Sequence, residues 1–99
     1  MISIELYSNG LIVSGHANAD TKGKDIYCAA VSAIVQGAIN WFYENEISFE
    51  LFDGYLKLKI LKLTKKNLEK LEMIAIQLWS LKSKDTKKYI DFKKNKKEI

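Results

Sequence analysis

One cysteine and one histidine are the residues of this sequence with the most distinctive chemistry. Cys28 and His16 are the only residues of their types among 99, and they lie twelve positions apart. A thiol and an imidazole that meet in the fold can act as the nucleophile and the general base of a cysteine hydrolase. If Cys28 also lies in the first turn of a helix, the free amides there favour its thiolate. The pair therefore predicts catalysis through a covalent bond to sulfur.

Asp25 lies shortly before Cys28, and its carboxylate has two possible roles. It could orient the imidazole of His16 as the third member of a triad, or it could cap the predicted helix. Asp20 is a further candidate for the orienting role. A carboxylate beside the thiol also opposes formation of the thiolate, so the sequence leaves both roles of Asp25 open.

A purely structural interpretation of the same residues is also available. A lone cysteine at the start of an alanine-rich helix is often a small buried hydrophobe. Trp41 and Trp79 lie on predicted helices at spacings that favour packing in the core over stacking on a ligand. One histidine and one cysteine are too few ligands for a zinc site, so we expect no metal.

Two strands and a helix must position the predicted pair. Residues 1–7 alternate between apolar and polar side chains, and residues 11–14 continue the pattern after Asn9-Gly10, a hairpin signal. Residues 17–24 lack any apolar periodicity and indicate an exposed connection. A helix is expected from about Asp25 to about Glu44. Its predicted buried stripe consists of Ile26, Ala29, Ala30, Ala33, Ile34, Gly37, Ala38, Trp41 and Phe42.

The second half of the chain repeats the alternation of strands and a helix. Asp53-Gly54 separates strands predicted over 47–52 and 55–61, and Thr64 can cap a helix that ends near Lys82. The predicted buried side of this helix consists of Leu68, Leu71, Ile74, Ala75, Leu78 and Leu81. A last strand is expected within 86–93. The order ββαββαβ predicts a single α+β domain over residues 1–99, with a mostly antiparallel sheet of about five strands and two helices on one face.

The composition is that of an ordinary globular chain with a basic end. Apolar residues make up 47%, charged residues 28%, and the net charge is +4. No apolar run of about eighteen residues and no secretory pattern is present, so we expect a cytoplasmic protein without a membrane segment. Eight of the 16 basic residues fall in 82–99, and all 16 are lysines. The lysine-rich end (93–99) is expected to be a solvated segment or to make weak, unspecific contact with ribosomal RNA.

The residues around the predicted pair resemble a known family, the ribosomal-processing cysteine proteases called Prp. The resemblance rests on Gly15-His16-Ala17, on the stretch from Gly23 to Ala29 (G-K-D-I-Y-C-A), and on Ser32-Ala33. The turn Asp53-Gly54-Tyr55 also fits, so the likeness extends up to about Asp91. Tyr27 departs from the family pattern, which has a small aliphatic residue at this position.

The resemblance implies an endopeptidase that removes a short N-terminal extension from the precursor of large-subunit ribosomal protein number twenty-seven. It assigns Cys28 as the nucleophile, His16 as the base and Asp25 as an assisting acid, with no cofactor, in a homodimer. The neighbouring residues are candidates for binding the peptide: Gly15, Ala17, Gly23, Ala29 and Ser32. Two hypotheses from other functional classes remain. They are a non-catalytic module that binds the ribosome and a purely structural homodimer.

Overall fold

In this computed structural model the structure describes residues 1–15, 24–81 and 89–99, and for Lys24 and Asp25 the backbone alone. The strands and α-helices follow the chain in the order β1 (Ile2–Tyr7), β2 (Gly10–Ser14), α1 (Lys24–Ala38), β3 (Ile47–Phe52), β4 (Tyr55–Ile60), α2 (Lys65–Trp79) and β5 (Ile90–Lys94). Two short 3-10 helices, Ile39–Trp41 and Glu44–Glu46, lie between α1 and β3. The predicted order ββαββαβ and the α+β class are therefore confirmed.

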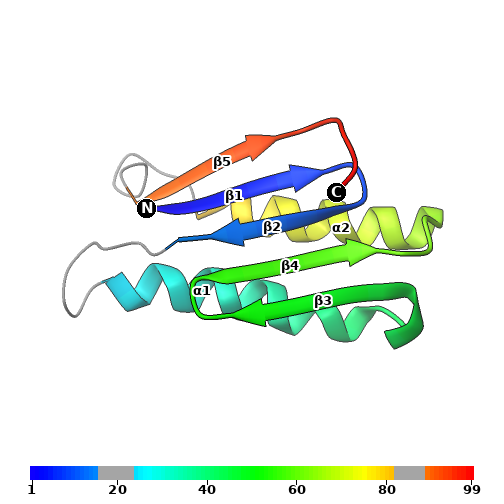
Figure 1. The fold of residues 1–99 in the computed structure, drawn as a ribbon, viewed down its shortest axis with the longest axis horizontal. Coiled ribbons are helices and arrows are strands. Elements are labelled where there is room, and N and C mark those ends of the chain that lie inside the picture. Colours follow the sequence, from blue (N-terminus) through cyan, green and yellow to red (C-terminus); the bar gives the residue numbers. More distant parts are fainter. Residues whose placement is uncertain (16–23, 82–88) are drawn as a thin grey trace.

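The strands form one sheet in the order β3-β4-β2-β1-β5 (Figure 1). All neighbouring strands are antiparallel except β5, which pairs with β1 in parallel. Two parallel strands require a crossover connection, and the chain between β1 and β5 includes α2. The sheet is thus mostly antiparallel, as predicted.

The two hairpins differ in how closely they follow their turn signals. Asp53 and Gly54 form the second turn, in which Gly54 has φ 71° and Phe52 pairs with Tyr55. In the first hairpin Tyr7 pairs with Gly10, so the prediction of an Asn9-Gly10 turn is wrong by one residue. A side chain at position 10 would lie 2.1 Å from the Leu58 carbonyl oxygen, so the neighbouring strand β4 requires glycine within β2.

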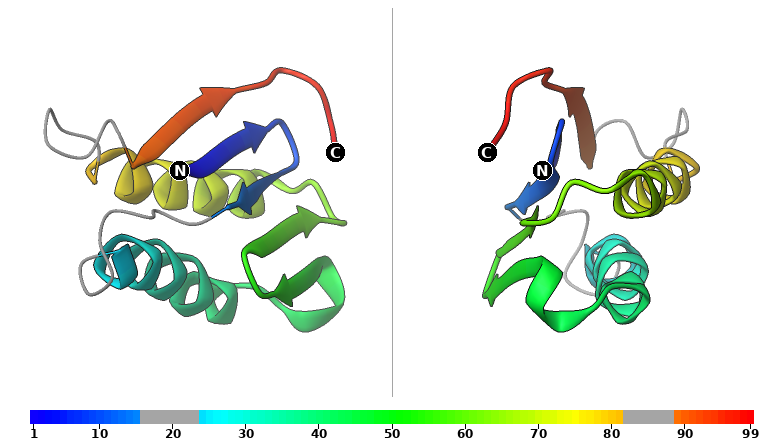
Figure 2. Two further views of the ribbon diagram at one scale, coloured as in Figure 1. Left: turned by 60° about the vertical axis from the view of Figure 1, so that its left-hand side comes forward. Right: turned by 90° about the vertical axis from the view of Figure 1, so that its right-hand side faces the viewer.

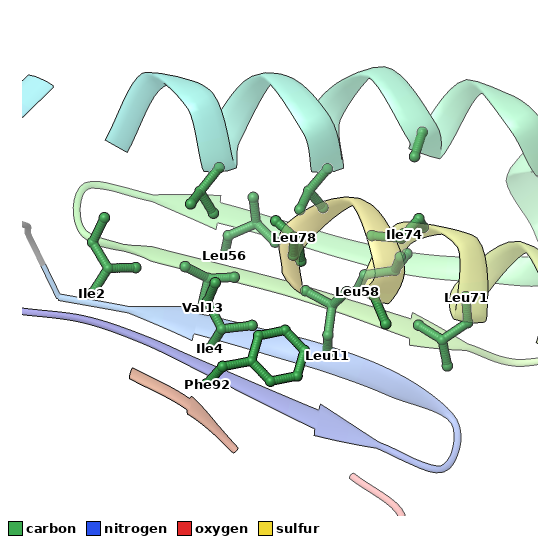
Figure 3. Close-up of a cluster of buried hydrophobic side chains, with 14 of the residues drawn as sticks. Ile2, Ile4, Leu11, Val13, Leu56, Leu58, Leu71, Ile74, Leu78 and Phe92 are labelled. Atoms are coloured by element: carbon green, nitrogen blue, oxygen red, sulfur yellow. The ribbon is translucent and has the colours of Figure 1, made fainter. Parts of the chain in front are cut away.

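Both helices cover the same face of the sheet, and the core lies between these two layers (Figure 2). Figure 3 shows alternate strand residues directed toward side chains of α2. The buried positions that the alternation predicted include Ile2, Ile4, Leu56 and Leu58. On α2 the buried residues include Leu71, Ile74 and Leu78, whereas Leu68 is 38% exposed. The strand pattern therefore predicted the inner face of the sheet.

The buried face of α1 matches the predicted stripe only in part. Ala38 is buried as predicted. Val31 and Val35, which the stripe left out, are buried as well, whereas Ile26 is 66% exposed and Ala29 is exposed. The valines contribute more apolar area to the core than alanine or glycine would, so this helix turns the valine side inward.

Both predicted helices end earlier than expected. α1 ends at Ala38 and continues as a 3-10 turn to Trp41, after which the backbone at Phe42 is extended. α2 begins after Thr64, whose side chain accepts from the Asn67 amide as predicted, and it ends at Trp79. Trp41 and Trp79 are 39% and 50% exposed, so the expectation that they lie in the core is wrong.

The lysine-rich end packs on the first hairpin. The amide of Asn95 donates to the Leu6 carbonyl at 2.7 Å, and the amide of Ser8 donates to the Lys97 carbonyl at 3.0 Å. The amide of Ile99 donates to Oδ1 of the buried Asn9 at 2.8 Å. The backbone of this segment is therefore held, while its lysines remain exposed.

Candidate active site

An open cleft of about 320 Å³ lies where the beginning of α1 meets the sheet. Its lining comes from β1, β2, α1 and the β3–β4 hairpin: Ile2, Val13, Gly15, Cys28, Val31, Ser32, Leu51, Phe52, Asp53, Gly54, Tyr55 and Leu56. In Figure 1 the start of α1, the end of β2 and the β3–β4 turn lie at the same end of the molecule. The cleft thus combines segments that are distant in sequence.

Cys28 is half-buried, packs against the core and lines this cleft. Because α1 begins at Lys24, Cys28 is the fifth helical residue, so its expected place in the first turn is wrong. In a regular helix the amide of the fifth residue donates to the carbonyl of the first. Helical side chains lean toward the N-terminus, so the side chain of Cys28 leans toward the first turn, whose amides have no helical partner.

Gly15 lies at the end of β2 and on the wall of the same cleft. Its φ of 88° is a left-handed conformation, and a side chain here would lie 2.3 Å from the Met1 carbonyl oxygen. Its amide donates to the Gly54 carbonyl at 2.9 Å, which ties the end of β2 to the β3–β4 turn. Both backbone demands explain a glycine at this position.

Of the other predicted binding residues in the described ranges, Ser32 lines the cleft and Ala29 does not. Ser32 follows Cys28 by one helical turn, and its Oγ accepts a hydrogen bond from Gln36 Nε2. Ala29 is exposed on the outer side of α1. Position 32 therefore faces the same space as the thiol, and position 29 is outside it.

The remaining predicted site residues lie outside what the structure describes. His16, Ala17 and Gly23 fall in the range 16–23, and for Asp25 only the backbone, in the first turn of α1, is described. The roles of His16 as base and of Asp25 as orienting or capping group therefore stay predictions. Gly15, which directly precedes His16 in sequence, does line the cleft.

The β3–β4 hairpin supplies a wall that the sequence did not assign to the site. Leu51 is 49% exposed and Phe52 is 64% exposed, and the rings of Phe52 and Tyr55 lie with centroids 6.2 Å apart. Consecutive strand residues point to opposite faces, so Leu51 and Phe52 cannot both enter one core. Two adjacent apolar residues before a tight turn were the available signal for an apolar surface here.

No three His, Cys, Asp or Glu side chains among residues 1–15, 24–81 and 89–99 are grouped so that they could hold a metal ion. Within the same part of the chain, no helix is long and apolar enough to cross a membrane.

Comparison with known sequences connects nearly the whole chain with one family. The sequence model of the cysteine protease Prp family matches residues 1–91. The ribosomal processing cysteine protease Prp of Mycoplasma pneumoniae is 37% identical over 83 residues, which cover 82% of this chain and 83% of that one. The protein of the same name from Mycoplasma genitalium is 47% identical over 49 residues, and this match spans half of each chain.

Solved structures share the fold of this chain. The essential ribosomal processing protease Prp from S. aureus, in complex with a covalently linked product peptide, superposes with a TM-score of 0.81 at 19% identity. That match covers 96% of this chain and all of the other. The same S. aureus protein in complex with a substrate peptide gives a TM-score of 0.80 at 18% identity. The arrangement of two helices on a five-stranded sheet is thus shared with these structures.

Proposed function

Because this chain belongs to the cysteine protease Prp family, we propose that Cys28 and His16 cleave the precursor of a ribosomal protein. The specific substrate we propose is the precursor of large-subunit ribosomal protein number twenty-seven, from which an N-terminal extension is removed. The relatives from two Mycoplasma species are named for ribosomal processing, which supports this class of substrate.

The position of Cys28 in the open cleft is the observation that carries the proposal. A thiol that served only as a packed hydrophobe would be enclosed, whereas Cys28 is half-buried and lines a space of about 320 Å³. Gly15 lines that space too, and the next residue in sequence is the only histidine of the chain. These positions support an encounter between sulfur and imidazole at the mouth of the cleft.

The proposed reaction proceeds through a thioester. The thiolate of Cys28 attacks the scissile carbonyl carbon, and His16 gives a proton to the leaving amine as the peptide bond breaks. Water activated by His16 then hydrolyses the thioester and releases the second product. The amide of Cys28 belongs to the regular helix and already has an acceptor there. The free amides of the first turn of α1 would therefore stabilise the oxyanion.

The lining of the cleft indicates which side chains the substrate presents next to the cleaved bond. Three of the lining side chains that are buried, Ile2, Val13 and Val31, are called its floor, and the exposed Leu51 and Phe52 add an apolar wall. Burial of apolar surface against this lining would contribute to binding. We therefore propose that apolar substrate side chains occupy the cleft during cleavage.

Cleavage of the ribosomal precursor tests the proposal directly. The full chain should shorten the precursor from the same organism, and Cys28→Ala should abolish the reaction while the fold is retained. Iodoacetamide should modify Cys28 rapidly below about pH 7, and His16→Ala should remove this advantage. A Cys28→Ala variant that still shortens the precursor would refute the assignment of the nucleophile.

We also propose that the protein acts in the cytoplasm as a homodimer. These two properties are carried over from the sequence and from the resemblance to the family. The exposed side chains of Lys93, Lys94, Lys96 and Lys97 support a weak contact with ribosomal RNA. Sedimentation of the purified chain, alone and with ribosomes at increasing salt concentration, tests the dimer and the RNA contact.

A further inference from the structure

Two tyrosines form an aromatic contact beside the proposed nucleophile. The ring of Tyr27 stacks on the ring of Tyr89 with centroids 4.9 Å apart and an angle of 25° between the planes. Tyr27 directly precedes Cys28 on α1, and Tyr89 directly precedes β5. The contact therefore joins the beginning of the helix to the beginning of the edge strand.

Tyr89 is hydrogen-bonded to β1, the strand that contributes Ile2 to the floor of the cleft. Its carbonyl oxygen accepts from the Ile2 amide at 2.6 Å, and the next residue, Ile90, pairs with Ile2 in the sheet. Ile2 is almost fully buried and lines the cleft together with Cys28. The backbone of Tyr89 is thus fixed to Ile2, a residue of the cleft floor.

Few of the described side chains at the beginning of α1, from Ile26 onward, pack against the rest of the fold. Ile26 is 66% exposed, and the first fully buried side chain of the helix is that of Val31. Among the described side chains before Val31, only those of Tyr27 and Cys28 are packed against the core. Tyr27 is much the larger of the two, and its ring packs on that of Tyr89, so it contributes most of the apolar area that these two side chains bury.

We infer that Tyr27 and Tyr89 are positioning residues that hold the first turns of α1 so that Cys28 faces the cleft. This inference rests on the proposed function, in which Cys28 is the nucleophile. A displacement of about 1 Å at a reacting group can lower a rate about a hundredfold, so a stable helix start matters for attack on the carbonyl. The first-turn amides proposed to stabilise the oxyanion move with the same part of the helix.

A second aromatic contact offers a matched control for a merely structural role. The ring of Trp79 on α2 meets that of Phe92 on β5 edge-on, with centroids 5.2 Å apart and an angle of 87°. This contact also joins a helix to β5, but it includes no residue of α1 and none that lines the cleft. Its loss should lower the unfolding temperature without changing the reactivity of Cys28.

The experiment compares the Tyr27→Ala, Tyr89→Ala and double variants with Tyr27→Phe, Tyr89→Phe and the control Trp79→Ala. Each full chain is treated with iodoacetamide over a range of pH, and cleavage of the ribosomal precursor gives kcat and KM. We expect each tyrosine-to-alanine variant to lower kcat about 10- to 100-fold at nearly unchanged KM. The rate of alkylation below about pH 7 should fall in the same variants.

The double variant and the phenylalanine variants complete the test. Because the two rings act as a pair, the double variant should lose no more than either single one, and both phenylalanine variants should keep the activity. If Tyr27→Ala and Tyr89→Ala stay within about twofold of the parent chain, or if Trp79→Ala has the same effect on alkylation, the positioning role is wrong. Should an alanine variant fail to fold, the phenylalanine variants decide, since a large loss in either also contradicts it.

The behaviour of the parent chain separates this inference from the function on which it rests. If Cys28 of the parent chain reacts no faster below pH 7 than it does in the urea-unfolded chain, the proposed nucleophile is refuted and the inference with it. If the parent thiol is reactive and the tyrosine variants leave it unchanged, only the inference is overturned.

Discussion

At Gly15 the backbone meets two requirements that no other residue satisfies without strain. The left-handed φ of 88° suits glycine, and the Met1 carbonyl oxygen occupies the space that a side chain would need. The hydrogen bond from Gly15 to Gly54 then fixes the end of β2 next to the hairpin wall of the cleft. A single residue without a side chain thus determines where the chain leaves the sheet just before His16.

Substitution of Gly15 by alanine should therefore destabilise the fold and impair cleavage. We expect a loss of about 2–4 kcal/mol in the free energy of unfolding, measured in urea. Gly37→Ala is the control, because a side chain at this helical position meets nothing within 4 Å. It should raise the free energy of unfolding by about 0.5–1 kcal/mol. Equal stability of the two variants would contradict the strain at Gly15.

At the scale of the elements, α2 is held at its beginning by a buried amide. Asn67 is 2% exposed, and its Nδ2 donates to Glu46 Oε1 at 2.8 Å and to the Lys62 carbonyl at 2.9 Å. The Thr64 side chain caps the same turn. The first turn of α2 is thereby connected to the segment before β3 and to the segment after β4.

Replacement of Asn67 by leucine should remove its side-chain hydrogen bonds to Glu46 and Lys62 without opening a cavity. The partly buried Glu46 carboxylate and the Lys62 carbonyl would lose their donor, and we expect the free energy of unfolding to fall by about 1–3 kcal/mol. Denaturation in urea measures the change. The exposed Asn40 makes only a 3.4 Å hydrogen bond to the Gly37 carbonyl, so Asn40→Ala should change the stability by less than about 0.5 kcal/mol. A loss in Asn40→Ala as large as that in Asn67→Leu would refute the role of the buried amide.

At the scale of the whole molecule, the cleft and the lysine-rich end occupy different ends of the sheet. The start of α1 and the N-terminus lie at one end, and the C-terminus lies next to the β1–β2 turn at the other (Figure 1). Asn9 and Ser8, which bind the C-terminal backbone, belong to that turn. Stability and catalysis should therefore respond differently to changes in the lysine-rich end.

Removal of residues 96–99 should weaken the fold and leave catalysis intact. The hydrogen bonds from Ser8 and to Asn9 are lost, at about 1 kcal/mol each, while kcat and KM on the precursor stay unchanged. The double variant Lys96→Gln and Lys97→Gln keeps the backbone bonds and should retain its stability. If truncation abolished cleavage by a chain that remains folded, the separation of the lysine-rich end from catalysis would be wrong.

Local patterns predicted the elements of this fold better than their mutual contacts. Alternation and the Asp53-Gly54 turn sufficed for the strands because the signals lie within each hairpin. The first turn lies one residue earlier than predicted. Gly10 is required within β2 by its close contact with β4, a strand distant in sequence. The buried side of α1 was predicted only in part, because small apolar residues occur around the whole helix and periodicity alone could not distinguish its valine side.

In the candidate site, too, residues with a local signal were predicted and those that depend on the strand order were missed. The sequence identified Cys28, Gly15 and Ser32, which line one cleft, because their types and spacing resemble the family. The hairpin wall with Leu51 and Phe52 was missed because it depends on the strand order, in which β4 lies beside β2. No local pattern contains that order.

The parallel pairing of β1 with β5 has a consequence for how the enzyme matures during translation. Ile2 belongs to the strand that is synthesised before the other four, yet its partners Tyr89 and Ile90 are synthesised after β2, β3 and β4. Contacts between such distant residues form slowly, since the intervening chain must be ordered first. A nascent chain therefore cannot complete the pairing of Ile2, which lines the cleft together with the thiol, until β5 has emerged, and proteolytic competence should arise only after β5 has been synthesised.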